Sequence, residues 1–241
     1  PTVGIAGLTL GGGWGYSSRF LGLACDSLME IEFIDYKGNL ITANSNINED
    51  LFWASKGCGG GNFGVVVSMT FKLAAKVENV TLIDLEYTNL ATHNQVTVIR
   101  MYEKMFNNLD NKANFKMAVY NSNKKGRGIK IIGLYYGEEK EAKNILMPFI
   151  NLKYDKTLNL TYTSILEANR IIQDSHPDYE KYKSTGRFIY KEYSEEEIKQ
   201  ILNLLNDSAN GSVYTAITFY GLGGAVKDKD KDESAFYYRD A

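Results

Sequence analysis

Apolar and polar positions change their pattern near residue 75 of this 241-residue chain. Before that point the segments with strand or helix character are short and are separated by glycine. Apolar and β-branched runs predict strands, and Asn48 followed by two acidic residues predicts the start of a helix. The predicted elements are helical turns over 16–21, strands over 27–35, 40–43 and 65–73, and a helix over 48–54.

From residue 76 onward, strands alternate with longer helices. The last helix is specified best, because Ser194 and Glu197 have the spacing of a capping box and apolar residues follow at helical spacing. The pattern predicts an α+β fold in which an antiparallel sheet carries helices on one face. We expect strands over 80–87, 115–120, 129–136, 157–163 and 213–219, and helices over 92–107, 138–149, 165–173 and 194–206.

Charge and composition exclude several classes of partner. The net charge is −2, and neither region has the excess of basic residues that nucleic-acid binding requires. No apolar run reaches the length of a membrane span, so we expect neither nucleic acid nor a membrane as a partner. No signal peptide is visible, and we expect a soluble protein, cytoplasmic or secreted. The chain does not begin with methionine, and both ends look cut from a longer protein.

The cysteines and histidines give no pattern for a metal site. Tetrahedral zinc needs four ligands, and Cys25 and Cys58 have no histidine at ligand spacing. We expect two buried free thiols, with a single disulfide as the open alternative. His93 and His176 stand among polar residues and are expected at the surface.

Glycine is concentrated in two clusters, residues 11–15 and 57–64. Because glycine has no side chain, it permits positive φ and lets a ligand approach the main chain. Tight turns without a ligand are the alternative. The spacing of Gly59, Gly61 and Gly64 matches a dinucleotide fingerprint, but a helix precedes it and a strand follows. That order is the reverse of the one a nicotinamide-binding Rossmann unit requires.

Four motifs, read together, point to a family. They are PTVGIAGLTLGGGWG at 1–15, RFLGLACD at 19–26, DLFWA at 50–54 and GGGNFGVV at 59–66. In this order and spacing they resemble the berberine bridge enzyme-like FAD-linked oxidases of the vanillyl-alcohol oxidase/p-cresol methylhydroxylase superfamily. Residues 219–225 and 234–241 also resemble this family, near the end of its substrate domain.

The resemblance implies two domains and a cofactor. Residues 1–75 would be the second, C-terminal part of a p-cresol methylhydroxylase-type FAD-binding domain. Residues 76–241 would be an α+β substrate-binding domain that is incomplete at its C-terminal end. The implied cofactor is FAD, and any residues that attach it covalently would lie outside this chain. The implied FAD-binding residues are Thr2, Val3, Gly4, Ala6, Gly7, Leu8, Gly11, Gly12, Gly13, Gly15, Gly61, Asn62, Phe63, Gly64, Val65 and Val66.

The resemblance also implies an activity, that of an FAD-dependent oxidase acting on an alcohol, with sugars among the candidate substrates. Hydride would pass to flavin N5, and dioxygen would reoxidise the flavin. The expected partners are therefore a small-molecule substrate and dioxygen. The alternative is a non-catalytic fragment or binding module of this fold that holds no flavin.

The catalytic residues stay unidentified at this stage. The resemblance implies that the family's catalytic base and last flavin-contacting segment lie beyond residue 241. Leu8 stands where some members have a histidine next to the flavin. Tyr190, Tyr193 and Tyr220 are candidates for a sugar cleft, although strand propensity also explains most of the tyrosines.

Overall fold

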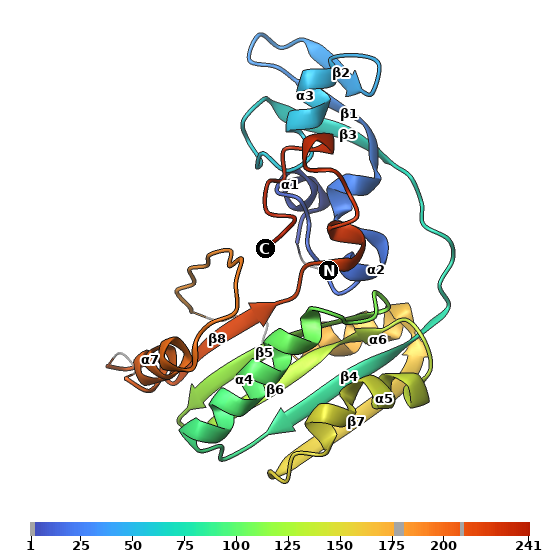
Figure 1. The fold of residues 1–241 in the computed structure, drawn as a ribbon. Helices are drawn as coiled ribbons and strands as arrows, with labels where there is room; N and C mark the ends of the chain where they lie inside the picture. The colour runs from blue at the N-terminus through green and yellow to red at the C-terminus, as the bar shows by residue number, and fades with distance from the viewer. Residues whose placement is uncertain (1–2, 176–180, 208–209) are drawn as a thin grey trace. The chain divides into compact units, whose positions relative to one another are not determined.

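The computed structural model describes residues 3–175, 181–207 and 210–241 and divides the chain into two compact units. One unit combines Pro1–Lys76 with Leu222–Ala241, and the other is Val77–Gly221. The family resemblance implies that residues 222–241 belong to the second domain, whereas the structure groups them with the first unit. Val226 and Phe236 share a hydrophobic core with Leu23 and Cys25, so the segment belongs to the first unit. Figure 1 shows this red segment beside the blue helices α1 and α2.

The first unit is built on a three-stranded antiparallel sheet in the order β2-β1-β3. Its core contains Ile31 and Phe33 of the central strand, with Ala43 and Phe52 packed against them. The strands lie within two residues of their predicted bounds. The elements are α1 (Ile5–Leu10), α2 (Ser18–Leu21), η1 (Ala24–Ser27), β1 (Leu28–Ile34), β2 (Leu40–Asn44), α3 (Glu49–Ala54), β3 (Val65–Phe71), η2 (Gly224–Val226) and η3 (Lys231–Glu233).

The second unit is a five-stranded sheet in the order β7-β4-β6-β5-β8, and all neighbouring strands are antiparallel. This confirms the expected α+β class. Every predicted strand and helix of this region is present. The elements are β4 (Asn79–Tyr87), α4 (Thr92–Phe106), β5 (Ala113–Ser122), β6 (Gly126–Tyr135), α5 (Glu139–Ile150), β7 (Lys156–Ser164), α6 (Ile165–Asp174), α7 (Glu195–Asn206) and β8 (Tyr214–Tyr220).

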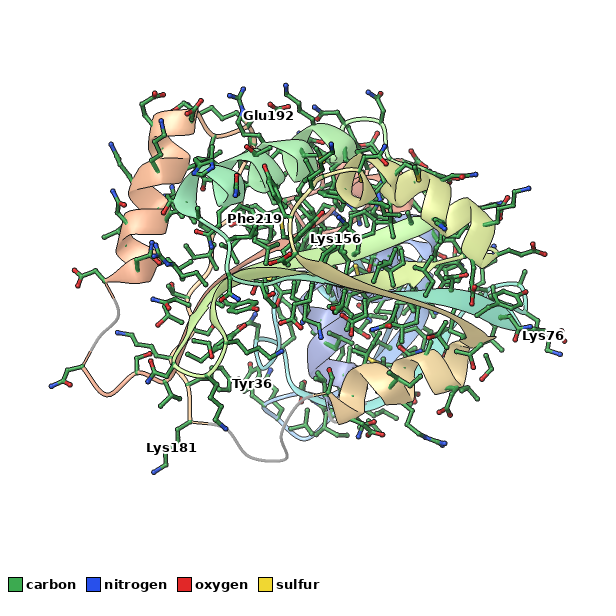
Figure 2. The ribbon with its side chains drawn as sticks, turned by 90° about the horizontal axis from the view of Figure 1, so that it is seen from below. Tyr36, Lys76, Lys156, Lys181, Glu192 and Phe219 are labelled. Atoms are coloured by element: carbon green, nitrogen blue, oxygen red, sulfur yellow. The ribbon has the colours of Figure 1, made fainter. Side chains whose placement is uncertain are left out.

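Helices α4, α5 and α7 cover one face of this sheet, and their apolar residues form one core with the strands. Figure 2 shows these helices on one side of the sheet and α6 on the other, so the expectation that all helices share one face is wrong for α6. The expected capping box at α7 is present. The Ser194 hydroxyl accepts a hydrogen bond from the Glu197 amide at 3.2 Å, and the Glu197 carboxylate accepts one from the Ser194 amide at 2.7 Å.

Three smaller expectations have different outcomes. Asn48 does not cap α3: it has φ 50°, and its side-chain amide donates to the Thr42 carbonyl at 2.7 Å instead. Both cysteines are free, but only one is buried as expected, because Cys58 lies on an exposed loop. His93 is exposed, as expected, and His176 lies outside the described residues.

Candidate functional site

The two glycine clusters lie against each other in the first unit. The Gly59 amide donates a hydrogen bond to the Leu10 carbonyl at 2.8 Å. An ideal Cβ placed on Gly60 would stand 3.9 Å from the Cα of Gly7. Helix α1, which carries Gly7 and Leu10, therefore packs on the loop that holds the second cluster.

Two of the clustered glycines make room for Phe236. Gly12 and Gly57 have positive φ values of 102° and 123°. An ideal Cβ on Gly12 would stand 2.5 Å from the Phe236 ring, and one on Gly57 would stand 2.5 Å from the Phe236 amide nitrogen. A side chain at either position would collide with Phe236, so packing within the protein accounts for both glycines.

Packing also accounts for Gly13 and Gly64. An ideal Cβ on Gly13 would stand 2.5 Å from the Cβ of Ala24. On Gly64, which has φ 155°, a Cβ would meet the carbonyl oxygen of Ile34. These glycines are needed whether or not a ligand is bound.

A second group of glycines faces open space. Among the described residues, no other atom lies within 4 Å of an ideal Cβ on Gly4, Gly7, Gly15 or Gly61, local chain neighbours aside. Three of them have no positive φ and so have no conformational need for glycine, Gly61 with φ 79° being the exception. An open main chain of this kind lets a large flat ligand lie in direct contact with the backbone.

The loop of the second cluster is braced by Asn62. Its side-chain amide donates to the carbonyls of Cys58 at 3.2 Å and Gly59 at 3.3 Å. Phe63 beside it is exposed, while Val66 packs partly against the core of the unit. These hydrogen bonds hold the loop conformation just before β3 begins at Val65.

The predicted FAD-binding residues differ in exposure. Thr2 lies outside the described residues, and Gly12 is buried. Those that are exposed are Val3, Gly4, Gly7, Gly11, Gly61, Asn62, Phe63 and Val65; those that are half-buried are Ala6, Leu8, Gly13, Gly15, Gly64 and Val66.

A polar surface covers part of the face of the second unit's sheet that lies opposite α4, α5 and α7; the rest of that face carries buried apolar residues such as Leu82 and Leu134. Glu86 accepts hydrogen bonds from the Tyr120 hydroxyl and the Lys125 ammonium, both at 2.9 Å. Lys130 forms an ion pair with Asp84 at 3.2 Å. Glu86, Tyr120 and Lys130 therefore bring charged and hydroxyl groups together on the face opposite the main apolar core.

Charge and burial shift the pKa values on this polar surface. Burial acts to raise the pKa of Glu86, but the hydrogen bonds from Lys125 and Tyr120 outweigh it and hold that pKa below its ordinary value. Burial lowers the pKa of Lys116, and the positive charge of Lys130 adds to this effect. Burial together with the Glu86 carboxylate raises the pKa of Tyr120.

The three tyrosine candidates do not come together. Tyr220 lies on β8 opposite Lys116 of β5 in the strand register, and it is 55% exposed. Tyr193 packs partly against the core beneath the helices, on the other face of the sheet. Tyr190 is exposed on the segment that precedes α7. Of the three, Tyr220 shares the polar surface.

Comparison with known sequences finds relatives that are named as FAD-linked proteins. No family model matches it. The uncharacterized FAD-linked oxidoreductase YgaK of Bacillus subtilis is 34% identical over 249 residues, which cover 99% of this chain and 52% of that protein. Berberine bridge enzyme-like 9 of Arabidopsis thaliana is 26% identical over 260 residues, covering 99% of this chain and 47% of the plant protein. The chain is a homologue of the berberine bridge enzyme-like FAD-linked oxidoreductases.

Solved structures agree with the homology. The xylooligosaccharide oxidase of Myceliophthora thermophila, solved with xylobiose, is 26% identical, with a TM-score of 0.79 over 100% of this chain and 52% of the oxidase. Berberine bridge enzyme from Eschscholzia californica has a TM-score of 0.80 at 22% identity and covers 100% of this chain and 49% of its own. The expected fold class of this berberine bridge enzyme-like homologue is thus confirmed.

The chain spans about half the length of the curated relatives it matches. Over the described ranges 3–175, 181–207 and 210–241, no helix combines the length and apolar character needed to cross a bilayer.

The sequence did not predict a role for two buried charged residues of this chain. The Arg239 and Asp26 side chains are 1% and 6% exposed and form an ion pair at 2.6 Å. Each lies inside a family-like motif, but nothing local indicates that residues 213 positions apart in the chain make contact. Only the tertiary structure brings them together beneath the first glycine cluster.

Proposed function

We propose that the intact protein is an FAD-dependent oxidoreductase and that this chain contributes part of its flavin site together with its substrate-binding domain. The observation that carries the proposal is the open main chain at Gly4, Gly7 and Gly61, in a chain of which 99% aligns with an FAD-linked relative. When bound, FAD supplies the hydride-accepting group of the reaction.

The first unit would hold the cofactor through its main chain. Residues 3–15 would approach the pyrophosphate, ribityl chain and isoalloxazine, since Gly4 and Gly7 are exposed and the space that a side chain on either would take is open. Residues 61–66 would lie against the adenosine end, where Phe63 and Val65 offer exposed apolar surface. Backbone N–H groups near a flavin ring stabilise negative charge on it without adding a titrating side chain.

The second unit would bind the substrate, and its polar surface supports an alcohol, sugars included, as the substrate class. Sugar hydroxyls need both donors and acceptors, and this surface offers Glu86, Lys116 and Tyr220. The relationship to a xylooligosaccharide oxidase supports the same class. Dioxygen as the electron acceptor is part of the proposal.

A matched pair of substitutions tests the cofactor site in the full-length protein. Gly7→Leu places a side chain on the open surface of α1, while Gly186→Leu places one in open space in the second unit. We expect Gly7→Leu to raise the dissociation constant for FAD, read by titration of the visible absorbance, roughly tenfold, which is about 1.4 kcal/mol. Its unfolding temperature should stay equal or rise, because leucine favours a helix more than glycine does.

The control variant, Gly186→Leu, should retain the flavin of the parent protein.

A full-length parent protein that is colourless and takes up no added FAD would support the alternative, a binding module without flavin. Hydrogen peroxide release with a panel of oligosaccharides and simple alcohols then tests the substrate class and the acceptor together.

A further inference from the structure

The main chain of the first glycine cluster is tied directly to the short helix η1. The Ala24 amide donates to the Gly13 carbonyl, and the Cys25 amide donates to the Gly12 carbonyl, each at 3.0 Å. These bonds fix the two carbonyls in direction. Whatever sets the position of η1 therefore also sets the conformation of residues 12–13.

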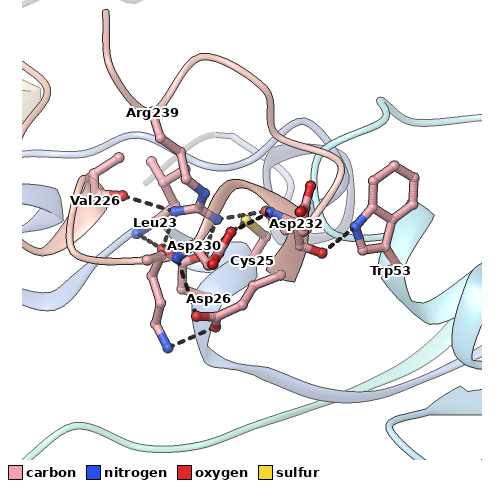
Figure 3. Close-up of polar contacts among 11 residues, drawn as sticks. Leu23, Cys25, Asp26, Trp53, Val226, Asp230, Asp232 and Arg239 are labelled. Atoms are coloured by element: carbon pink, nitrogen blue, oxygen red, sulfur yellow. Dashed lines mark hydrogen bonds and ion pairs between the residues drawn. The ribbon is translucent and has the colours of Figure 1, made fainter.

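Asp26 holds η1 in place and is itself held by Arg239. One Asp26 carboxylate oxygen accepts a hydrogen bond from the Leu23 amide at 2.9 Å, which caps the start of η1. The two Arg239 Nη atoms reach the two carboxylate oxygens at 2.6 and 3.2 Å. Figure 3 shows this bidentate pair with the Leu23 amide on the same carboxylate. Such paired, charge-assisted bonds fix orientation as well as distance.

Arg239 is in turn anchored within its own segment. It donates to the Val226 carbonyl at 3.0 Å and to the Ser234 hydroxyl at 2.6 Å. The guanidinium thus joins Asp26 to two positions of the C-terminal segment, Val226 and Ser234, at one buried point. Its planar array of donors suits this role in a way that a lysine ammonium would not.

Phe236, from the same segment, reaches both glycine clusters. It occupies the space that side chains at Gly12 and Gly57 would fill. Its amide donates to the Lys56 carbonyl at 3.2 Å, and the neighbouring Ala235 amide donates to the Trp53 carbonyl at 3.3 Å. The Trp53 indole returns a hydrogen bond to the Asp232 carbonyl at 2.8 Å (Figure 3).

We propose that residues 222–241 set the conformation of both glycine clusters, with the Asp26–Arg239 pair as the polar anchor and Phe236 as the apolar one. Arg239 and Phe236 are then positioning residues for the main chain that the proposed function assigns to the flavin. They act through Asp26, η1 and the glycines. The effect on flavin binding rests on the proposed function. The effect on the conformation of the glycine clusters rests only on the hydrogen bonds and contacts described above.

The rival interpretation is that the Asp26–Arg239 pair only stabilises the fold. A double substitution distinguishes this interpretation from a positioning role. Arg239→Met alone leaves a buried carboxylate without its counter-ion and is expected to destabilise the fold strongly. Asp26→Asn with Arg239→Met removes both charges, and replacing a buried pair in this way often restores stability. The bidentate link between η1 and the C-terminal segment stays absent in the double variant.

Amide hydrogen exchange in the full-length protein without added cofactor is the direct measurement. For the double variant we expect exchange in peptides covering residues 11–15 to be roughly tenfold faster than in the parent. Strands of the second unit should be unchanged. Phe236→Leu is the second variant, with faster exchange expected in peptides covering both 11–15 and 57–64.

Lys229→Met is the control, because Lys229 forms an exposed ion pair with Glu233 in the same segment. It should leave the exchange of both clusters unchanged. Parent-like exchange at 11–15 in a folded double variant overturns the proposal. In the holoenzyme, the double variant should shift the visible flavin spectrum and weaken FAD binding while its unfolding temperature recovers. If the parent binds no FAD, the proposed function fails, and hydrogen exchange still decides the positioning role.

Discussion

Phe236 fills the volume that a side chain at Gly57 would need: an ideal Cβ on Gly57 stands 2.5 Å from the Phe236 amide nitrogen and 2.6 Å from its Cβ. A residue of the C-terminal segment thereby dictates a glycine in a loop far earlier in the chain.

This contact predicts the cost of Gly57→Ala relative to a matched glycine. Gly38 also has positive φ, 85°, but its Cβ direction is open among the described residues. Gly38→Ala should cost about 1–2 kcal/mol of unfolding free energy through backbone strain. Gly57→Ala should cost about 2 kcal/mol more, because the added methyl also displaces Phe236. Denaturant unfolding of both variants measures the difference, and equal costs would contradict the packing described.

The two free cysteines should differ in reactivity. Burial and the neighbouring Asp26 carboxylate raise the pKa of Cys25 to about 12, so its thiolate is scarce at neutral pH. Cys58 is exposed. We expect a thiol reagent to label Cys58 in the native protein and Cys25 only after unfolding, as read by mass spectrometry of peptides. Rapid native labelling of Cys25 would show that the core around Phe236 opens readily.

Glu86→Gln should destabilise the second unit at neutral pH. The carboxylate is 15% exposed and holds Tyr120 and Lys125. Its pKa is lowered in the folded state, so its contribution is present above the ordinary carboxyl pKa and disappears as pH falls through the folded-state value. A loss of about 1 kcal/mol is expected at pH 7 and none in strong acid. Glu196→Gln, at an exposed position on α7, controls for the loss of one negative charge.

Glu103→Gln should have the opposite effect. Burial raises the pKa of Glu103, with the Glu192 and Glu197 charges adding to it against the Tyr193 amide and Arg100. One carboxylate oxygen is buried without a hydrogen-bond partner among the described residues. A raised folded-state pKa means that the native state loses stability as pH rises through the ordinary carboxyl range. The glutamine variant should therefore unfold at higher temperature at pH 7 and lose this advantage near pH 4. An advantage independent of pH would argue against the charge as its cause.

Local pattern was enough to predict the strands and most helices. Helix α7 has its capping box and apolar face within its own sequence, so the prediction from Ser194 and Glu197 is confirmed. Helix α1 was not predicted from the sequence, because Gly4 precedes it, Gly7 lies within it, and glycine is a poor helix former. Asn48 has the residue type of a helix cap, but its side chain finds a partner on β2 instead.

The site depended on contacts that the sequence does not reveal. Glycine clusters marked a candidate region, yet the sequence alone could not separate Gly12, which accommodates Phe236, from Gly7, which faces open space. Phe236 lies more than two hundred residues from Gly12, and Arg239 is as distant from Asp26. Such pairs have no periodicity or spacing by which a single sequence can identify them.

The first unit is assembled from two segments, one that precedes the second unit in the sequence and one that follows it. During synthesis, Val77–Gly221 leaves the ribosome before Phe236 and Arg239 exist, and domains generally fold in the order in which they emerge. Until all of Val77–Gly221 has been made, η1 and both glycine clusters would therefore lack their contacts with Phe236 and Arg239. Premature termination after β8 would leave a chain that has the five-stranded sheet but lacks the segment that anchors η1 and both glycine clusters, a form that quality control is equipped to remove.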